Sequence, residues 1–266
     1  MTILAIANAK GGVGKTTTAL TLAAALADGP ASKKGSPRVL LVDLDPGGGL
    51  TGILRRPVED PASSAHRLLT EPEADLSALP QETDIPGVDL VASHPVMSTL
   101  DAQLSTVVDR EFRLRTGLAS LTAGARGYGW VVLDSGPYMG ILSINVLTAA
   151  HAVVLPLPPE FVVLLGGRML LDYVQQIRDH FNPELRILGI LPTMVDARTR
   201  HAREMLDQLR SVFGDLVFEQ AIPYTVRLKE APILGASILS YDPSCRAAEA
   251  YRALAGEVQA RCRASV

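Results

Sequence analysis

Short apolar runs recur along the chain, separated by stretches with helical spacing or by polar loops. Mainly apolar runs of five to seven residues are typical of strands that are buried on both faces. Such runs lie at 3–7, 38–43, 87–92, 128–134, 152–157 and 185–191. Helices are expected at 18–27, 64–69, 109–125, 161–181 and 247–263. This alternation predicts an α/β fold, with a doubly wound, mostly parallel sheet flanked by helices.

Polar stretches rich in proline, glycine and serine divide these elements. Residues 28–37 and 235–243 are expected to form exposed loops. Residues 55–84 are expected to form short helices and loops at the surface, and their residue types indicate no particular chemistry. Asn182-Pro183 should end the long helix, because a residue before proline avoids the helical conformation.

Composition narrows the range of protein classes. The chain has 266 residues, of which 47% are hydrophobic and 20% charged, so residues 1–266 are expected to form a single domain with an ample core. The formal net charge is -3, so any contact with DNA would need a local basic patch. The two cysteines lack metal-ligand spacing, which is typical of a reducing cytoplasm without structural zinc or iron–sulfur clusters. Neither a signal peptide nor an apolar run of about 18 residues is seen, so a cytoplasmic protein is expected.

One segment between the first predicted strand and the first predicted helix is rich in glycine and carries two lysines. It reads Lys10-Gly11-Gly12-Val13-Gly14-Lys15-Thr16-Thr17. Glycines let backbone N–H groups converge on one point, and a helix N-terminus adds partial positive charge there. A strand, a glycine loop and a helix that starts with Lys-Thr form the phosphate-binding loop of nucleotide-binding proteins.

The whole segment is therefore predicted to contact a nucleotide. Lys15 is expected to meet the β- and γ-phosphates, and the Thr16 hydroxyl is expected to ligate Mg²⁺. The alternative is a chance glycine loop, which the spacing, the flanking elements and the Lys-Thr pair together argue against.

Acidic residues end two of the predicted strands. Asp43 and Asp45 follow one strand, and Asp134 closes another. Open α/β sheets bind their ligands at the carboxyl ends of their strands. Asp43 and Asp134 are predicted to hold Mg²⁺ through water, and Asp45 is predicted to orient the water that attacks the γ-phosphate. The alternative for Asp45 is that it caps a helix, which is compatible with its orienting the water. The alternative for Asp134 is that it caps the next turn.

The second lysine makes the loop unusual. The ordinary motif has a glycine where this chain has Ala9, and Lys10 lies inside the loop. This form resembles the deviant Walker A motif of the ParA/MinD group of P-loop ATPases. In that group the loop lysine reaches across a dimer interface to the partner's nucleotide. The resemblance implies that two copies close face to face over two ATP molecules, with Lys10, Lys15 and Asp45 acting in catalysis; a solvated loop lysine is the alternative for Lys10.

The acidic segments depart from the ParA pattern. ParA proteins carry Asp-x-Asp-Pro-Gln-Gly-Asn after the second strand, where this chain has Gly47 for the glutamine and Gly49 for the asparagine. They continue Asp-x-Pro-Pro after the later acidic strand, where this chain has Gly136 for the first proline. A missing amide and a looser loop leave ATP binding intact and predict a weak intrinsic rate of hydrolysis.

A basic segment spans residues 196–229. Acidic residues are interleaved with the cations, so composition alone favours a solvated helix face. Residues 222–232, however, resemble the Ile-Pro-x-x-Val-Arg-Leu-x-Glu-Ala-Pro segment of chromosomal ParA proteins. In those relatives, arginines matching Arg198 and Arg227 bind DNA without sequence specificity. The residues predicted to bind DNA phosphates are Arg198, Arg200, Arg227 and Lys229.

The same segment is expected to hold the base of the nucleotide. In relatives, the residues matching Pro223 and Thr225 lie along the adenine. The family usually has Arg-Asn where this chain has Tyr224-Thr225. That replacement removes one positive charge and one base-recognising amide, which weakens the case for DNA affinity and for strict adenine preference.

The resemblance extends to the closing helix, where Asp242, Pro243, Ala248 and Tyr251 match the family. MinD proteins end in a basic amphipathic helix whose bulky apolar residues enter the bilayer. Residues 257–266 contain no Phe, Trp, Leu or Ile, so no membrane docking is expected.

The resemblance as a whole implies a ParA-type partition ATPase with ATP and Mg²⁺ as its cofactors. The ATP-bound homodimer would bind nucleoid DNA, and a ParB-type centromere-binding protein would stimulate hydrolysis and release it. Three alternatives stay open at this point. They are a DNA-binding switch with negligible hydrolysis, a MinD-like positioning ATPase, and a ligase or reductase acting on a small molecule.

Overall fold

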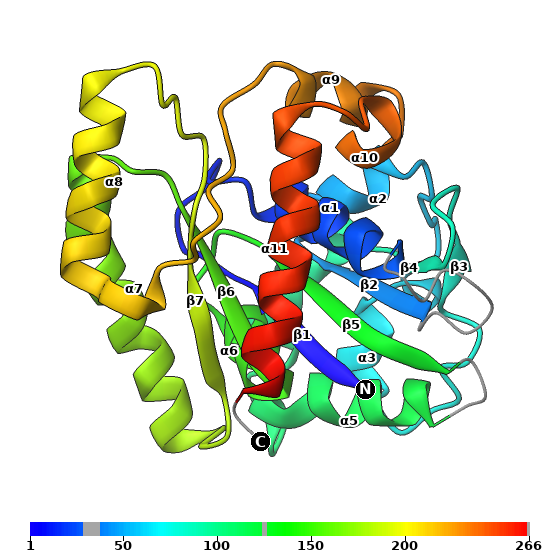
Figure 1. The fold of residues 1–266 in the computed structure, drawn as a ribbon. Coiled ribbons are helices and arrows are strands. Elements are labelled where there is room, and N and C mark those ends of the chain that lie inside the picture. The colour runs from blue at the N-terminus through cyan, green and yellow to red at the C-terminus, as the bar shows by residue number, and fades with distance from the viewer. Residues whose placement is uncertain (29–37, 124–126, 265–266) are drawn as a thin grey trace.

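The structure is a computed structural model that describes residues 1–28, 38–123 and 127–264. Within these residues, seven strands form one sheet (Figure 1). Their bounds are β1 (Thr2–Ile6), β2 (Arg38–Leu44), β3 (Gln81–Glu82), β4 (Val88–Val91), β5 (Tyr128–Ser135), β6 (Ala152–Leu157) and β7 (Arg186–Pro192). The strand order is β3-β4-β2-β5-β1-β6-β7, and all neighbours are parallel except β3 and β4. The predicted α/β fold with a mostly parallel sheet is confirmed.

Helices cover both faces of the sheet (Figure 1). One face carries α1 (Lys15–Ala27), α2 (Gly49–Ile53), α9 (Arg227–Ile233), α10 (Ile238–Tyr241) and α11 (Arg246–Arg263). The other carries α3 (His66–Thr70), α4 (Leu100–Gln103), α5 (Arg113–Thr122), α6 (Ile141–Ala149), α7 (Phe161–His180) and α8 (Arg200–Phe213). Short 3₁₀ helices lie at η1 (Pro61–Ser63), η2 (Pro95–Thr99), η3 (Arg110–Phe112) and η4 (Gly214–Leu216).

The central strands are buried on both sides, which explains their nearly continuous apolar sequence. In β1, Ile3 and Ala5 join the core on one face, while Leu4 and Ile6 join the core on the other. Alternate side chains of a strand point to opposite faces, so a doubly covered strand needs apolar residues at every position.

Some predicted boundaries need correction. Residues 235–243, predicted as a loop, contain the short helix α10. The first helix begins at Lys15 and not at Thr18, because it starts within the glycine loop itself. The predicted loop at 28–37 lies, from residue 29 onward, outside the described residues.

The helix predicted over 109–125 is shorter than expected. The chain first forms the 3₁₀ turn η3, and α5 then ends at Thr122, while residues 124–125 lie outside the described part. Sequence patterns also missed α6, which is apolar on nearly all sides and therefore shows no helical period.

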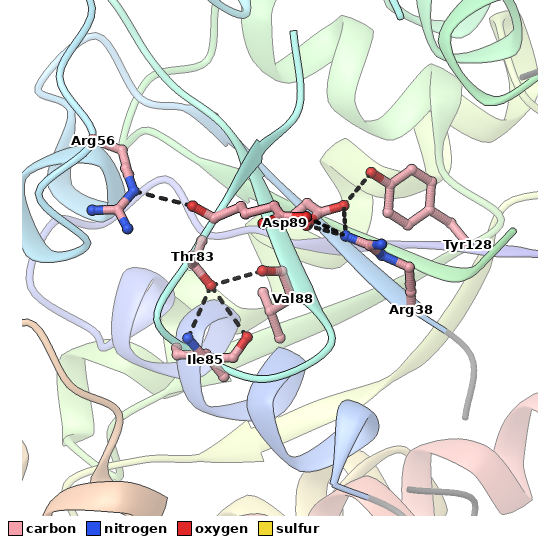
Figure 2. A network of polar contacts seen from close by, with 8 residues as sticks. Arg38, Arg56, Thr83, Ile85, Val88, Asp89 and Tyr128 are labelled. Carbon is pink, nitrogen blue, oxygen red and sulfur yellow. Dashed lines mark hydrogen bonds and ion pairs between the residues drawn. The ribbon is translucent and has the colours of Figure 1, made fainter. Parts of the chain in front are cut away.

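Polar contacts fasten the starting ends of β2, β4 and β5 (Figure 2). The Asp89 side chain is 1% exposed, and both of its carboxylate oxygens accept from Arg38 Nη2, at 2.7 and 2.8 Å. The Tyr128 hydroxyl donates to the same carboxylate at 2.6 Å. Thr83 Oγ1 donates to the Val88 carbonyl at 2.7 Å and so secures the β3–β4 hairpin. These contacts fix the register of three strands at the edge where each strand begins.

A separate finding concerns membranes. Across residues 1–28, 38–123 and 127–264, no helix combines the length and the apolar character that crossing a bilayer requires.

Candidate functional site

The carboxyl ends of β1, β2 and β5 meet at one edge of the sheet, because these strands are parallel neighbours. Asp134 pairs in register with Ile6 on one side and with Asp43 on the other. The glycine loop leaves β1 at this edge. The structure therefore brings together three segments that are far apart in the sequence, and each carries residues predicted to act on a nucleotide.

The glycine loop is shaped for an anion. Gly12 and Gly14 have φ values of 72° and 91°, a left-handed conformation that favours glycine. Gly14 is the N-cap of α1, and no side-chain hydrogen bond caps the helix there. The N–H groups of the first turn are thus left for a bound anion, as at other phosphate-binding helix starts.

Lys15 lies inside this loop. Its side-chain nitrogen donates to the carbonyl of Lys10 at 3.0 Å, and the residue is 6% exposed. Burial lowers the pKa of the Lys15 ammonium, while the negative charges of Asp134 and Asp45 act in the opposite direction. A buried cation between the loop and two carboxylates lies where phosphate oxygens would meet it.

Asp134 is the most unusual group of the site. It is fully buried, and neither carboxylate oxygen has a hydrogen-bond partner among the residues that the structure describes. Burial raises its pKa well above the usual range, and the neighbouring Asp43 adds to the effect. The Thr16 hydroxyl faces this carboxylate and opposes the shift without completing a hydrogen bond. A buried carboxylate without a partner is costly unless a cation neutralises it.

These groups fit a magnesium ion that also binds phosphates. Mg²⁺ usually takes one or two protein oxygens and completes its shell with water and phosphate. Asp134 and Thr16 offer two such oxygens. Within the described ranges there is no cluster of three or more His, Cys, Asp and Glu that could hold an ion without such help.

Asp43 is buried beside Asp134 but is tied into the fold. One of its oxygens accepts from the backbone and hydroxyl of Thr51, at 2.8 and 2.7 Å, and the other accepts from the Asp45 N–H at 3.2 Å. Burial raises the pKa of Asp43 to about 6. Its oxygens thus hold α2 in place. Because they are already hydrogen-bonded, the predicted contact of Asp43 with Mg²⁺ would run through a water molecule.

Asp45 does not cap a helix. Its Oδ1 accepts from the Gly47 N–H at 2.9 Å and closes a turn, whereas Gly48 is the N-cap of α2. The Ser93 hydroxyl donates to the Asp45 carbonyl at 2.6 Å and holds the backbone in place. The carboxylate is close enough to Lys15 to influence its pKa, so it lies beside the phosphate-binding loop.

A pocket adjoins the glycine loop on the side of β7. It holds about 450 Å³ of space, part of it open to solvent, and both Pro223 and Thr225 line it. Gly14 and Thr193 also line it, and the Thr193 hydroxyl donates to the Val13 carbonyl at 2.9 Å. The two residues predicted to lie along a base are therefore in a pocket that opens directly onto the phosphate-binding loop.

Comparison with known proteins shows which family the chain belongs to. The chain is 37% identical over 258 residues to the sporulation initiation inhibitor protein Soj of Bacillus subtilis, covering 97% of this chain and 98% of Soj. The chain belongs to the ParA/Soj family. It is also 37% identical to the chromosome partitioning protein ParA of Caulobacter vibrioides, over 97% of this chain and 94% of that protein. A family model described as an AAA domain matches residues 1–187.

A solved structure extends the likeness to three dimensions. It is named as cobyrinic acid a,c-diamide synthase from Mycobacterium smegmatis, with bound ADP and magnesium. The two chains share 33% identity with a TM-score of 0.83, and the alignment covers 100% of this chain and 97% of the other.

The three glycines that depart from the ParA pattern lie around Asp45 and Thr16. A Cβ added at Gly136 would be 3.2 Å from Asp45 Oδ1, and one added at Gly47 would be 3.3 Å from it. A Cβ added at Gly49 would be 3.3 Å from Thr16 Cγ2 and 3.5 Å from its hydroxyl. Two glycines thus flank the Asp45 carboxylate, and the third leaves space beside the predicted magnesium ligand.

Lys10, the residue that marks the deviant loop of the ParA group, lies on the outer side of the loop. Its side-chain nitrogen is 3.0 Å from Glu160 Oε2, and both side chains are more than half exposed. An exposed pair of this kind contributes about 0–1 kcal/mol, so it can be exchanged for a stronger contact.

The cations predicted to bind DNA are all engaged within the chain. Their partners are Asp196 for Arg198 at 2.8 Å, Glu204 for Arg200 at 2.6 Å, Asp242 for Arg227 at 3.3 Å, and the Tyr224 ring and hydroxyl for Lys229. Sequence reasoning noted the interleaved acids but not these pairings. The Glu204 pairing was the accessible signal, since Glu204 lies four residues from Arg200 on one helix.

Proposed function

We propose that this member of the ParA/Soj family is an Mg²⁺-dependent ATPase that closes as a homodimer on ATP. The dimer binds nucleoid DNA without sequence specificity, and a ParB-type centromere-binding protein stimulates hydrolysis and releases it. Residues 1–266 act as one ATPase domain in the cytoplasm. The name of the Caulobacter vibrioides relative, chromosome partitioning protein ParA, supports partition as the process.

The observation that carries the proposal is the buried, unpartnered carboxylate of Asp134 beside Thr16 and Lys15. A buried carboxylate without a hydrogen-bond partner is stabilised when a cation binds to it. The ADP and magnesium bound by the Mycobacterium smegmatis neighbour support Mg²⁺·nucleotide as the occupant.

Each residue has a defined task in this proposal. The loop N–H groups and Lys15 bind the phosphates, and Thr16 and Asp134 hold Mg²⁺, with Asp43 acting through water. When bound, the ion neutralises charge on the phosphates. Asp45 orients the attacking water, and Lys10 leaves Glu160 to reach the nucleotide of the second copy. Catalysis then consists of positioning and charge neutralisation.

The intrinsic rate of hydrolysis is proposed to be weak. The glycines at 47 and 136 bring no side chain against the Asp45 carboxylate, whose Oδ1 accepts from the Gly47 N–H, and no amide at position 47 holds the water or the partner chain. Binding does not depend on these positions, so ATP affinity is retained while turnover is slow.

The dimer is tested by gel filtration of the Asp45→Ala variant with Mg²⁺·ATP. This variant should bind ATP and elute as a dimer, because its nucleotide survives. Lys15→Ala is the matched control and should stay monomeric, since it lacks the phosphate-binding cation. A monomeric Asp45→Ala protein with ATP shown to be bound would refute the proposed closure.

DNA binding and turnover are tested together. With Mg²⁺·ATP, random duplex DNA should bind and dissociate steeply as salt rises. Steady-state ATPase activity should rise when DNA and a ParB-type protein are added. DNA binding without any such rise would instead favour a regulatory switch with negligible hydrolysis.

A small-molecule reaction is a second candidate, because the name of the Mycobacterium smegmatis neighbour is that of an amide-forming synthase. That chemistry needs an acid substrate and an amide donor. ATP-dependent binding to random DNA would argue against it, and ATP turnover that depends on a small carboxylic acid would argue for it. A MinD-like role would instead require ATP-dependent binding to lipid vesicles.

A further inference from the structure

A wide groove lies at the edge of the sheet where its parallel strands begin, opposite the edge that carries the glycine loop. Residues from the start of β1, from α5, from the segment after α6 and from the start of β7 line it, and Figure 1 shows the first two beside each other. The groove holds about 1700 Å³ of space, part of it open to solvent, against about 450 Å³ for the pocket beside the glycine loop. The proposed ATPase makes no use of this groove.

His151 gives the groove one directional donor. Its Nδ1 accepts from the Ile3 N–H at 2.9 Å, so the neutral ring carries its proton on Nε2. Nε2 has no hydrogen-bond partner among the residues that the structure describes. Burial lowers the pKa of His151, and the positive charges of Arg115 and Arg186 add to the effect, which favours the neutral ring. His151 therefore offers an N–H group to a ligand in the groove.

Two arginines give the groove its positive charge. Arg115 is exposed and lies over the Phe112 ring, and its Nε and Nη2 both donate to the Thr148 carbonyl. Arg186 is partly buried, and its Nη1 and Nη2 reach the Cys262 carbonyl only at 3.4 Å. Neither guanidinium forms an ion pair with any residue in the described ranges. Each serves a single carbonyl oxygen, so other N–H groups of both are left for a ligand.

The charges that line the groove do not cancel. Glu184 is the one acidic residue in the described lining, and it forms no ion pair with either arginine of the groove. The whole chain has a formal net charge of -3, so the excess of positive charge here is local. Like charges that face one cavity repel each other, and an anion bound between them relieves that repulsion.

Small apolar residues supply much of the remaining lining. Ala119 is an exposed position of α5, and Pro183 is exposed between α7 and β7. Such short side chains leave room beside the arginines for larger apolar groups of a ligand, which gain stability when they leave water. The groove thus combines cations, one N–H donor and apolar surface, and it is much larger than a single anion needs.

We propose that this groove binds an acidic, partly apolar peptide segment of a partner protein, whose carboxylates pair with Arg115 and Arg186. The Nε2 of His151 donates to a carbonyl of the peptide. Its aliphatic side chains pack against the apolar part of the lining. The proposal does not rest on the proposed function, because the groove and the glycine loop lie at opposite edges of the sheet.

Fluorescence anisotropy of the full chain without nucleotide tests the proposal with three labelled probe peptides. They alternate leucine with glutamate, glutamine or lysine, so that an extended chain presents the two residue types on opposite sides. The glutamate peptide should bind at least about tenfold more tightly than the glutamine peptide, because its carboxylates pair with two guanidiniums. The lysine peptide should show no binding. The affinity of the glutamate peptide should fall as salt rises, since exposed charges are screened.

Variants test the charges in both directions. Arg115→Gln and Arg186→Gln should each weaken the glutamate peptide by about two- to fivefold, as expected for exposed charge pairs, while Arg186→Lys should retain most of the affinity. Glu184→Gln should strengthen binding by a similar factor, because it removes the acid of the lining. Arg252→Gln is the matched control and should change nothing. Arg252 is exposed, donates to one carbonyl, that of Pro243, and lies outside the groove.

Imidazole NMR signals locate the bound peptide. The chain has five histidines, and the signal that disappears in His151→Gln identifies His151. The glutamate peptide should shift this signal, because it binds beside Nε2. The signal of His201, which lies on α8, should stay in place.

Several results would overturn the proposal and leave the proposed ATPase standing. They are no binding of the glutamate peptide, equal binding of the glutamate and glutamine peptides, and affinities that ignore Arg115→Gln, Arg186→Gln and Glu184→Gln. Succinate that binds as tightly as the glutamate peptide would show a site for small anions instead. An oligothymidylate that binds equally well would show a site for polyanions, and either finding would exclude a peptide as the specific occupant.

Discussion

Replacing Asp196 by asparagine should strengthen DNA binding, because it frees a guanidinium that the protein itself neutralises. Arg198 Nε and Nη2 each lie 2.8 Å from a different oxygen of Asp196. The arginine side chain is 86% exposed. The pairing lowers the pKa of Asp196 to about 2, so the acid is charged at neutral pH. Asp196→Asn keeps the shape of this side chain and removes its charge.

The size of the effect follows from the exposure of the pair and from the charge of DNA. Solvent screens an ion pair as exposed as this one, so a DNA phosphate can displace Asp196 at little cost. Each additional phosphate contact steepens the slope of log affinity against log salt by about 0.9. Between 50 and 200 mM salt, the variant should therefore lose about three to four times more affinity than the parent, while binding more tightly at 50 mM.

Fluorescence anisotropy with a labelled random duplex, Mg²⁺·ATP and a series of salt concentrations measures both quantities. Asp207→Asn is the matched control, because it makes the same change in net charge on the exposed side of α8. The native Asp207 forms no ion pair with any residue that the structure describes. If both variants shift the affinity equally and leave the slope unchanged, Arg198 does not contact phosphate and the reasoning is refuted. Adding Arg198→Ala to the Asp196→Asn variant should remove the extra contact and return the slope to that of the parent.

Three further predictions concern pH, stability and turnover. Because burial raises the pKa of Asp43 to about 6, the folded state binds that proton more tightly, and the free energy of unfolding of the metal-free protein should fall by about 2 kcal/mol as pH rises from 4 to 7. Urea unfolding in EDTA, compared with Asp43→Asn, should show this fall in the difference between the two proteins. Tyr128→Phe should cost about 1.5–3 kcal/mol in urea unfolding, because it removes a hydroxyl that donates to the buried Asp89 carboxylate, while the exposed Tyr138→Phe control should cost nothing measurable. Gly47→Gln should raise steady-state ATP turnover without changing ATP affinity, and unchanged turnover would show that the missing amide does not limit the rate.

The sheet was predictable because doubly covered strands must be apolar at nearly every position, as in β1 and β6. Helices without a one-sided pattern were not, and α6 is the clearest example. The glycine loop was recognisable because its glycines and its Lys-Thr pair lie together in the sequence.

Contacts across the fold were not predictable from the sequence. Gly136 and Asp45 are 91 positions apart, and only the parallel pairing of β2 with β5 brings them together. The contact between Lys10 and Glu160 spans 150 positions. The assignment of Lys229 to DNA could not anticipate the Tyr224 ring, because the contact depends on how the chain turns into α9.

The three glycines around Asp45 and Thr16 are proposed to affect the rate of ATP hydrolysis more than the affinity for ATP. In the proposed cycle, a dimer stays on DNA until its ATP is cleaved, so the rate of cleavage sets the lifetime of the DNA-bound dimer. In that cycle the glycines beside Asp45 and Thr16 are proposed to slow the cleavage of ATP, while the phosphate-binding loop retains its affinity for the nucleotide. The DNA-bound dimer would then have a long lifetime, and the partner that accelerates cleavage would decide when and where the dimer is released.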